Sequence, residues 1–548
     1  MKHSLSGKII DIFNRNIFNG SVHWENGNIT AIREEVSVPH QYLLPGFIDA
    51  HIHIESSMLT PYEFARMALT HGTVATVSDP HEIANVCGLE GVSYMLDDAA
   101  DAKLKFFFGA PSCVPATGFE TAGAILESES VGSLLNDDRI LYLAEMMNYP
   151  GVLNDDEEVY RKIALAKKYG KPVDGHAPGL RGADAERYIA AGISTDHECV
   201  TKEEALDKLK HGMKILIREG SAAKNFNALY SLIAEYPDEI MLCSDDKHPD
   251  DLIHGHMDDL VRRALAHGLD MYDVLRAVCV NPVLHYRLPV GLLRKNDPAD
   301  FIVVDNLSHW KVKETYVNGE KVVENGACFL PAKKHTVINH FKANEKDITD
   351  FLMPDTGGNI RVMEALDGQL ITSESLVDTS LLNAESLPEH GTLTSSVEND
   401  ILKITVVNRY ADTKPGMAFI RNFGLKRGAI AGTVAHDSHN IIAVGVHDED
   451  LCRAVNLLIR NKGGLCVVDG IEELLLPLPV AGLMSDKDCK TTGMAYAALD
   501  RKSKEMGCML KAPFMTLSFM ALLVIPSLKL SDKGLFDVSA FKFADHKI

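Results

Sequence analysis

LPGFIDAHIH, residues 44–53, is the part of the chain from which the architecture can be built outward. It predicts a short buried strand, because it is apolar with a β-branched centre and opens with a Pro-Gly turn. His51 and His53 lie two positions apart at its end. Side chains at i and i+2 of an extended chain point to the same side, so both imidazoles can reach one metal ion. Zinc, iron or manganese suits such ligands, although His-x-His also occurs as two ordinary polar residues leaving a strand.

Length and composition set the broad class of the protein. A chain of 548 residues is expected to form two or three domains with a sizeable core. Its net charge is −21, from 55 basic and 76 acidic residues, which argues against a nucleic acid or an anionic membrane as the main partner. We therefore expect a small-molecule substrate, no nucleic acid and no membrane.

The cysteines and the N-terminus predict a cytoplasmic location. The chain has 10 cysteines but no Cys-x-x-Cys pair, which makes a structural zinc knuckle improbable. Its first residues, MKHSLSGKII, lack the apolar core of a signal peptide. One apolar run, residues 514–530, is short and interrupted by Thr516, Pro526 and Ser527, so it predicts a buried core segment.

Between residues 44 and 285, short apolar runs alternate with helical patterns, which predicts a parallel sheet wound with helices. Eight strands are expected, at residues 44–49, 73–78, 105–109, 140–144, 172–175, 192–196, 214–218 and 240–244. Helices are expected at residues 61–71, 155–168, 183–191, 202–210, 222–234 and 251–266. Eight strand–helix units of this length predict an α/β fold with a (β/α)8 barrel.

The segments around the barrel predict two further units. Residues 1–43 and 286–340 have alternating strand patterns with Asn26-Gly27 and Asn318-Gly319 turns, and we expect them to form one discontinuous β-sandwich domain. Residues 341–548 combine strand patterns, such as 401–407 and 441–446, with a helical pattern at 448–461. They predict a C-terminal α+β domain.

Chemistry-bearing residues follow most of the predicted barrel strands. They are His51 and His53 after the first strand, Asp79-Pro80-His81-Glu82 after the second, Glu145 after the fourth, His176 after the fifth, His197 after the sixth and Asp245 after the eighth. Barrel active sites lie at the C-terminal ends of the strands, where these side chains converge. Four histidines and two carboxylates at one end of a barrel are hard to assign to chance.

This set predicts a binuclear metal centre. Glu145 would bridge the two ions, His51, His53 and Asp245 would hold one, and His176 and His197 the other. Nitrogen and oxygen donors without thiolates point to iron, manganese or zinc. A bridging water that loses a proton would attack an electrophilic carbon, and Asp245 would take that proton and pass it to the leaving group. Asp245 can also act purely as a ligand, and both roles can hold at once.

Other polar residues at the same end have two interpretations each. Arg218, Glu219 and Ser221 are candidates to hydrogen-bond a heteroaromatic substrate, but Ser221 is equally a good N-cap for a following helix. His81 and Glu82 are candidate proton shuttles or structural supports, and Glu55 is similarly ambiguous. The His-rich stretch at His436 and His439 lies either at the barrel mouth or in a surface loop.

With these residues in place, the chain resembles the adenine deaminases of the amidohydrolase superfamily over essentially its whole length. The resemblance is carried by PGFIDAHIH at 45–53, SDPHEIAN at 78–85, AEMMN at 144–148, GHAPG at 175–179, TDHE at 195–198, SDD at 244–246 and AHDSHN at 435–440. Where many superfamily members have a carbamylated lysine on strand four, this sequence has Glu145, as that family does.

The resemblance implies hydrolysis of adenine to hypoxanthine and ammonia in purine salvage, with a binuclear manganese or iron centre. Hydroxide would add to C6 of the purine, a proton would reach ring N1, and protonation of the amino group would release ammonia. Asp245 suits the hydroxide proton, and Glu82 or Glu219 is a candidate for N1. We also expect a homo-oligomer, with a dimer favoured.

Two other functions remain open from the sequence. A cyclic-amide hydrolase of the same superfamily would share the His-x-His strand, but Glu145 and the long third domain favour the deaminase. A non-catalytic relative would be expected to have lost ligands, and all six are present.

Overall fold

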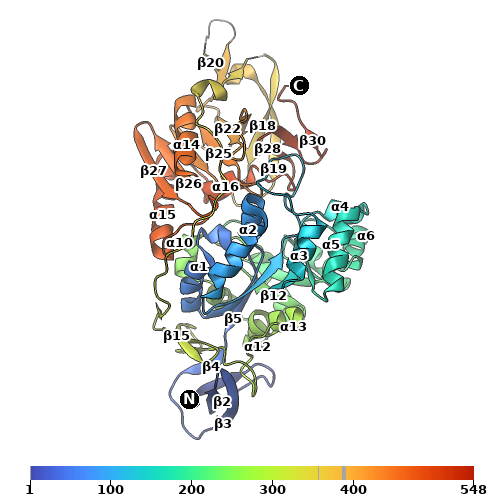
Figure 1. The fold of residues 1–548 in the computed structure, drawn as a ribbon, viewed down its shortest axis with the longest axis vertical. Helices are drawn as coiled ribbons and strands as arrows, with labels where there is room; N and C mark the ends of the chain where they lie inside the picture. Colours follow the sequence, from blue (N-terminus) through green and yellow to red (C-terminus); the bar gives the residue numbers. More distant parts are fainter. Residues whose placement is uncertain (1, 356, 386–390, 548) are drawn as a thin grey trace.

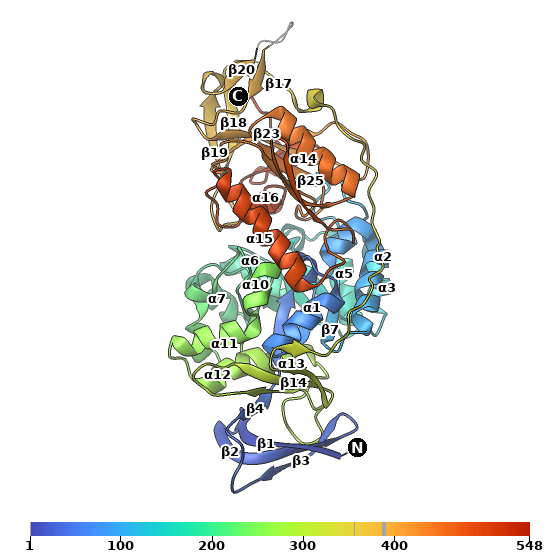
Figure 2. The same cartoon turned by 90° about the vertical axis from the view of Figure 1, so that its left-hand side faces the viewer.

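In the computed structural model, which describes residues 2–355, 357–385 and 391–547, three bodies are stacked along the long axis. A sheet with the N-terminus lies at one end, the barrel lies in the middle, and the C-terminal domain lies at the other end (Figures 1 and 2). The C-terminal domain lies over the barrel, and residues of both line one cavity.

The strands before and after the barrel share one eight-stranded sheet, in the order β16-β15-β14-β13-β4-β1-β2-β3. Its strands are β1 (Lys2–Asp11), β2 (Asn16–Glu25), β3 (Asn28–Glu34), β4 (Tyr42–Pro45), β13 (Phe301–Val304), β14 (Val312–Val317), β15 (Glu320–Glu324) and β16 (Ala327–Cys328). The two parts join where β4 pairs in parallel with β1 and antiparallel with β13. Trp24 packs edge-on against Phe301 and Tyr316, so the core of this sheet also draws on both parts. The domain limits drawn from the sequence stay predictions.

The first predicted barrel strand, residues 44–49, is wrong in its limits. The chain divides at Gly46: β4 ends at Pro45 in the N-terminal sheet, and β5 (Phe47–Ile52) begins the barrel. A Cβ atom on Gly46 would lie 2.3 Å from Val74 Cγ1. The crossing from one sheet to the other therefore requires a residue without a side chain.

The barrel consists of eight parallel strands. They are β5, β6 (Thr73–Ser78), β7 (Lys105–Ala110), β8 (Ile140–Met146), β9 (Val173–Gly175), β10 (Thr195–Asp196), β11 (Lys214–Arg218) and β12 (Ile240–Cys243). Strands β5–β9 and β10–β12 pair as two sheets, and parallel bridges between Val173 and Ile193 and between Ile52 and Asp245 close the ring. The amide of Asp245 donates to the carbonyl of His51 at 2.9 Å, so closure itself brings these two residues together.

Most predicted barrel helices are present with small shifts. The helices of this part are α1 (Pro61–Ala68, continued by a 3-10 turn Leu69–His71), α2 (His81–Ala100), α3 (Ser128–Leu135), α4 (Tyr149–Leu153), α5 (Glu157–Lys168), α6 (Gly182–Ala190), α7 (Lys202–Lys210), α8 (Phe226–Leu229), α9 (Leu232–Glu235), α10 (Pro249–His254), α11 (Met257–Ala266), α12 (Met271–Leu275) and α13 (Asn281–Tyr286). The predicted helix at 251–266 is two helices, because the chain breaks at Gly255, which has φ 175° and ψ 158°.

The continuous helix predicted at 222–234 is wrong: only the short helices α8 and α9 form there. The side chain of Asn225 accepts from the amide of Arg218 and donates to the carbonyls of His197 and Cys199. These bonds hold the chain in a loop until Phe226, since an Asn side chain that binds backbone groups competes with helix formation. Ser221 therefore caps no helix.

The C-terminal domain is built on a second eight-stranded sheet, in the order β19-β18-β23-β22-β25-β24-β26-β27. Its strands are β18 (Asn359–Ala365), β19 (Thr372–Asp378), β22 (Ile401–Val407), β23 (Gly416–Arg421), β24 (Ala429–Gly432), β25 (Ile441–Gly445), β26 (Gly464–Asp469) and β27 (Glu472–Pro477). Helix α14 (Asp448–Asn461) packs on one face through a cluster of buried apolar side chains. The strands expected at 401–407 and 441–446 and the helix expected at 448–461 are present, within one residue.

The apolar run at 514–530 is a core segment, as predicted. It contains most of α16 (Pro513–Phe519), which follows α15 (Cys489–Glu505), and it leads into the hairpin of β28 (Leu528–Ser531) and β29 (Gly534–Asp537). Phe514, Leu517, Phe519 and Leu530 are all buried. Within the described residues, no helix has the length and apolar character needed to cross a membrane.

Candidate metal centre and active site

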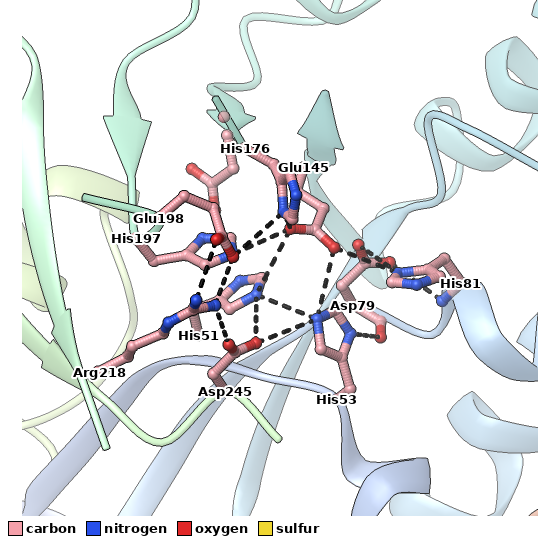
Figure 3. A network of polar contacts seen from close by, with 12 residues as sticks. His51, His53, Asp79, His81, Glu145, His176, His197, Glu198, Arg218 and Asp245 are labelled. Carbon is pink, nitrogen blue, oxygen red and sulfur yellow. Dashed lines mark hydrogen bonds and ion pairs between the residues drawn. The ribbon is translucent and has the colours of Figure 1, made fainter. Parts of the chain in front are cut away.

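All six predicted metal ligands meet at the C-terminal ends of the barrel strands. His51 lies near the end of β5 and Glu145 near the end of β8, and the others follow their strands directly: His53 after β5, His176 after β9, His197 after β10 and Asp245 two residues after β12. Each of the six is at most 8% exposed. Figure 3 shows their side chains pointing at one another.

Glu145 is the centre of this cluster. Its Oε2 atom lies 2.9 Å from His176 Nδ1 and 3.1 Å from His197 Nε2. Its Oε1 atom lies 3.4 Å from His53 Nε2. The two carboxylate oxygens therefore face different histidines, as a residue that bridges two cations must.

The second part of the cluster consists of Asp245 with His51 and His53, the two histidines at the end of β5. Asp245 Oδ1 lies 3.6 Å from His51 Nε2 and 3.4 Å from His53 Nε2. The His51 ring stacks on His197, with centroids 4.1 Å apart. The triad of His51, His53 and Asp245, and that of His51, Glu145 and His197, each place their donor atoms within 4.8 Å of one another.

The residues fit a divalent metal centre. Four imidazole nitrogens, His51 Nε2, His53 Nε2, His176 Nδ1 and His197 Nε2, lie between 2.9 and 3.6 Å from a carboxylate oxygen of Glu145 or Asp245. Buried nitrogen and oxygen donors that converge in this way are what a site for a divalent transition metal presents. The structure also brings Asp79 and His81 to the cluster, since His81 Nδ1 lies 3.1 Å from Asp79 Oδ2 and 3.5 Å from Glu145 Oε1.

The two carboxylates that face the histidines are ionised. Burial alone would raise the pKa of Glu145, but His176 and His197 hold it well below its usual value. Burial opposes ionisation of Asp245 as well, yet Arg218 and hydrogen bonds from the strand-end histidines keep its pKa well below the ordinary range. A buried pair of negative charges framed by nitrogen donors attracts cations.

Arg218 reaches the cluster, but its partners are acidic side chains. Its Nη1 atom contacts Glu198 and lies 2.5 Å from Asp245 Oδ2, and its Nη2 atom lies 2.9 Å from Glu198 Oε2. These bonds orient Asp245. Glu198 had no assigned role in the sequence-based prediction, although its position directly after His197 was a usable signal.

The other two predicted substrate-binding residues lie outside the cluster. Glu219 accepts from Arg263 at 2.6 Å, and Ser221 donates to Asp251 at 2.7 Å. Strand β11 ends at Arg218 and the chain then turns away through Gly220, whose amide bonds the carbonyl of Ala223. Neither Glu219 nor Ser221 is among the described residues that line the cavity beside the cluster.

Glu82 and His81 lie at the start of α2, on the wall of that cavity. Glu82 is fully buried, and its Oε1 atom accepts from Ser56 Oγ at 2.8 Å. Burial raises the pKa of Glu82 well above its usual value, with nearby Glu55 adding to the effect. Burial likewise raises the pKa of Glu55 to about 7. Burial therefore favours the protonated form of the Glu82 carboxyl.

The C-terminal domain completes the cavity. Leu370, His436, Asp437, Phe519, Leu522 and Val524 line it opposite the barrel residues. The His436 ring stacks on Phe519, with centroids 4.8 Å apart and 16° between the planes. His436 and His439 are buried, so they lie at the barrel mouth and not in a surface loop. Leu370 and Phe519 carried no signal in the sequence that linked them to the site.

Comparison with known proteins agrees with this arrangement. Residues 42–326 match the amidohydrolase family, and residues 377–542 match the adenine deaminase C-terminal domain. The chain is 52% identical to adenine deaminase of Methanosarcina mazei over 98% of both chains. It is 53% identical to that of Salinibacter ruber, over 99% of this chain and 98% of the relative, and 54% identical to that of a Sulfurovum species over 99% of both. This chain belongs to the adenine deaminase family of amidohydrolases.

Proposed function

We propose that this chain hydrolyses adenine to hypoxanthine and ammonia. The observation that carries the proposal is the convergence of Glu145 and four histidines, which come from four barrel strands, in one buried cluster. It occurs in a chain about half identical, over nearly its full length, to proteins named adenine deaminase. The cluster supports metal-dependent hydrolysis, and the similarity to the adenine deaminases supports adenine as the substrate.

The centre proposed is binuclear, with manganese or iron as the metal and zinc as an alternative. His51, His53 and Asp245 would hold one ion, His176 and His197 the other, and Glu145 both. When bound, such ions lower the pKa of a water molecule and make hydroxide available at neutral pH.

The proton transfers are assigned to Asp245 and Glu82. In the reaction a C6–O bond forms and the C6–N bond breaks; of the two protons of the attacking water, one passes to the leaving nitrogen and the other is balanced by the proton that ring N1 gains in the product. Asp245 is ionised and is oriented by Arg218, so it is suited to accept the first proton. Glu82 lies on the cavity wall and burial raises its pKa, so it is suited to donate a proton to ring N1. His81, held by Asp79, is the candidate shuttle between the cluster and the cavity.

The cavity suits a flat, weakly polar base. Leu370, Phe519, Leu522 and Val524 form an apolar side, and the ionised and protonated carboxyls lie opposite. Apolar walls with a few convergent polar groups are typical of small-molecule sites. Glu219 is not retained as the donor to N1, because it bonds Arg263 away from this cavity.

Cyclic-amide hydrolysis is the weaker candidate. Glu145 at the bridging position and the C-terminal wall of the cavity both favour the deaminase. A non-catalytic role is disfavoured because all six ligands lie within one cluster. A role in purine salvage, a cytoplasmic location and a homodimeric state are proposed with the activity.

The deciding assay follows adenine loss and ammonia release by manganese-loaded protein, with adenosine, cytosine and dihydroorotate as parallel substrates. Turnover of adenine alone is expected, and Glu145→Gln serves as the inactive control. No adenine turnover by protein with two verified metal ions per chain would overturn the proposal. Turnover of dihydroorotate instead would favour the cyclic-amide alternative.

A further inference from the structure

Two buried polar atoms from different domains face each other without a hydrogen-bond partner. Glu82 Oε2, from the barrel, and His439 Nε2, from the C-terminal domain, lie 4.0 Å apart. Both residues are fully buried, and neither atom has a hydrogen-bond partner among the described residues. Leaving two such atoms unpaired is costly, so each is the natural partner of the other.

The hydrogen bond on the far side of the His439 ring decides which nitrogen carries the proton. The backbone amide of Ala435 donates to His439 Nδ1 at 3.3 Å. Nδ1 must then present a lone pair, so the proton of the neutral ring lies on Nε2. Nε2 is the nitrogen that lies 4.0 Å from Glu82 Oε2, so the ring offers its N–H on the side of that carboxyl.

The loop that carries His439 is held in place. It connects β24 to β25, and the amide of His439 donates to the carbonyl of Ala435 at 2.7 Å. The next residue, Asn440, donates to the carbonyl of Thr121 of the barrel at 2.9 Å. The imidazole is therefore presented to Glu82 by a loop that is itself tied to the barrel.

We propose that His439 is a positioning residue for Glu82, and this inference rests on the proposed function. Ser56 of the barrel donates to the Oε1 atom at 2.8 Å, and His436 Nδ1 lies 3.6 Å from the same atom. His439 Nε2 lies 4.0 Å from the Oε2 atom and is placed to act on that side of the carboxyl. The carboxyl plane of Glu82 is thereby fixed toward the cavity. The C-terminal domain thus helps to orient Glu82, in addition to lining the cavity.

An alternative interpretation is that Glu82 and His439, together with His436, bind another metal ion. Glu82, His436 and His439 have candidate ligand atoms within 4.8 Å of one another. A metal on His439 Nε2 requires the lone pair there and the ring proton on Nδ1. The Nδ1 proton would then face the amide proton of Ala435, so the observed bond favours the hydrogen-bond donor.

The test is a double-mutant cycle between His439→Ala and Glu82→Gln in the metal-loaded protein. His439→Ala is expected to lower kcat for adenine about 10- to 100-fold, the usual effect of losing such a supporting contact, with KM changed less than threefold. In the Glu82→Gln background the same substitution is expected to have no further effect. His439→Gln, which keeps an N–H donor, is expected to recover part of the loss.

Asn456→Ala is the matched control, because Asn456 is also buried in the C-terminal domain but bonds the backbone of Lys346 away from the cavity. It is expected to lower the thermal midpoint while leaving kcat near wild type. Additive effects in the cycle would overturn the inference, as would the loss of one metal equivalent per chain in His439→Ala. If the wild-type protein itself fails to deaminate adenine, the proposed function fails first, and the two failures are thereby distinguished.

Discussion

The Nε2 atoms of His51 and His53 face each other across 3.2 Å. Two neutral imidazoles that approach in this way direct lone pairs at one another unless a proton or a cation lies between them. Neighbouring Asp245 Oδ1 lies within 3.6 Å of both nitrogens, so the site is arranged for positive charge. This relationship leads to the first prediction.

His51→Ala is expected to reduce bound metal below two ions per chain. The variant loses one nitrogen donor and the support it gives to Asp245, so kcat should fall roughly 10³-fold, in keeping with the several kcal/mol supplied by a metal centre. Metal analysis of purified protein, together with the ammonia assay, measures both. His254→Ala, at an exposed position on α10, is the control and should retain metal and activity.

Glu145→Gln is expected to leave the barrel folded but to lose metal. The amide keeps the shape of the side chain and removes the charge that His176 and His197 face. Since the strands and core do not depend on this group, the far-UV circular dichroism spectrum should be unchanged. Retention of two metal ions by the variant would contradict the bridging role.

Lys529 is expected to make stability depend on pH. It is fully buried, and its Nζ atom donates to the carbonyls of Leu370 and Phe519, two residues of the cavity wall. Burial lowers its pKa from 10.5 to about 7. The unfolded chain therefore binds more protons between these values, so stability should rise from pH 7 to pH 10, by at most about 1.4 kcal/mol per pH unit.

Lys529→Met is expected to remove that rise and to weaken adenine binding, because the wall loses its two hydrogen bonds. Thermal midpoints at pH 7 and pH 9 test the first effect, and KM tests the second. Lys403→Met is the matched control, since Lys403 is a buried lysine of the same domain that bonds Phe351 and Asp448 away from the cavity. An equal pH slope in wild type and Lys529→Met would refute the assignment.

His335 is expected to make stability fall as pH rises, the opposite of Lys529. It lies on the segment that links the N-terminal sheet to the C-terminal domain, and its ring lies 3.1 Å from Asp98 and 3.4 Å from Glu63. Burial lowers its pKa, but these carboxylates outweigh that effect and raise the pKa from 6.5 to about 9. Its stabilising contribution is therefore complete below pH 6.5 and is lost as pH rises through 9.

The prediction for His335 is tested by measuring the thermal midpoint of the His335→Asn variant as a function of pH. The difference in thermal midpoint between wild type and His335→Asn should be largest near pH 6 and smallest near pH 10. A difference that stays constant over this range would show that the ring contributes by packing and not by charge.

The barrel and its candidate metal ligands could be derived from local sequence patterns alone. Alternation along a strand places His51 and His53 on one side, and the C-terminal ends of parallel strands must meet at one edge of a barrel. Glu145, His176, His197 and Asp245 could be found in this way because each lies at or just after a recognisable apolar strand. Each of these signals involves only residues that are close together in the sequence, so it can be recognised without knowledge of the tertiary structure.

Which of the neighbouring residues face the cavity depends on tertiary packing. Glu219 and Ser221 follow β11 within three residues, yet the loop held by Asn225 turns them toward Arg263 and Asp251. Phe519 and His439 approach the site from the C-terminal domain, about 270 and 190 residues beyond Asp245 in the chain. Such contacts depend on how the C-terminal domain packs on the barrel, and no periodicity in either segment encodes that packing.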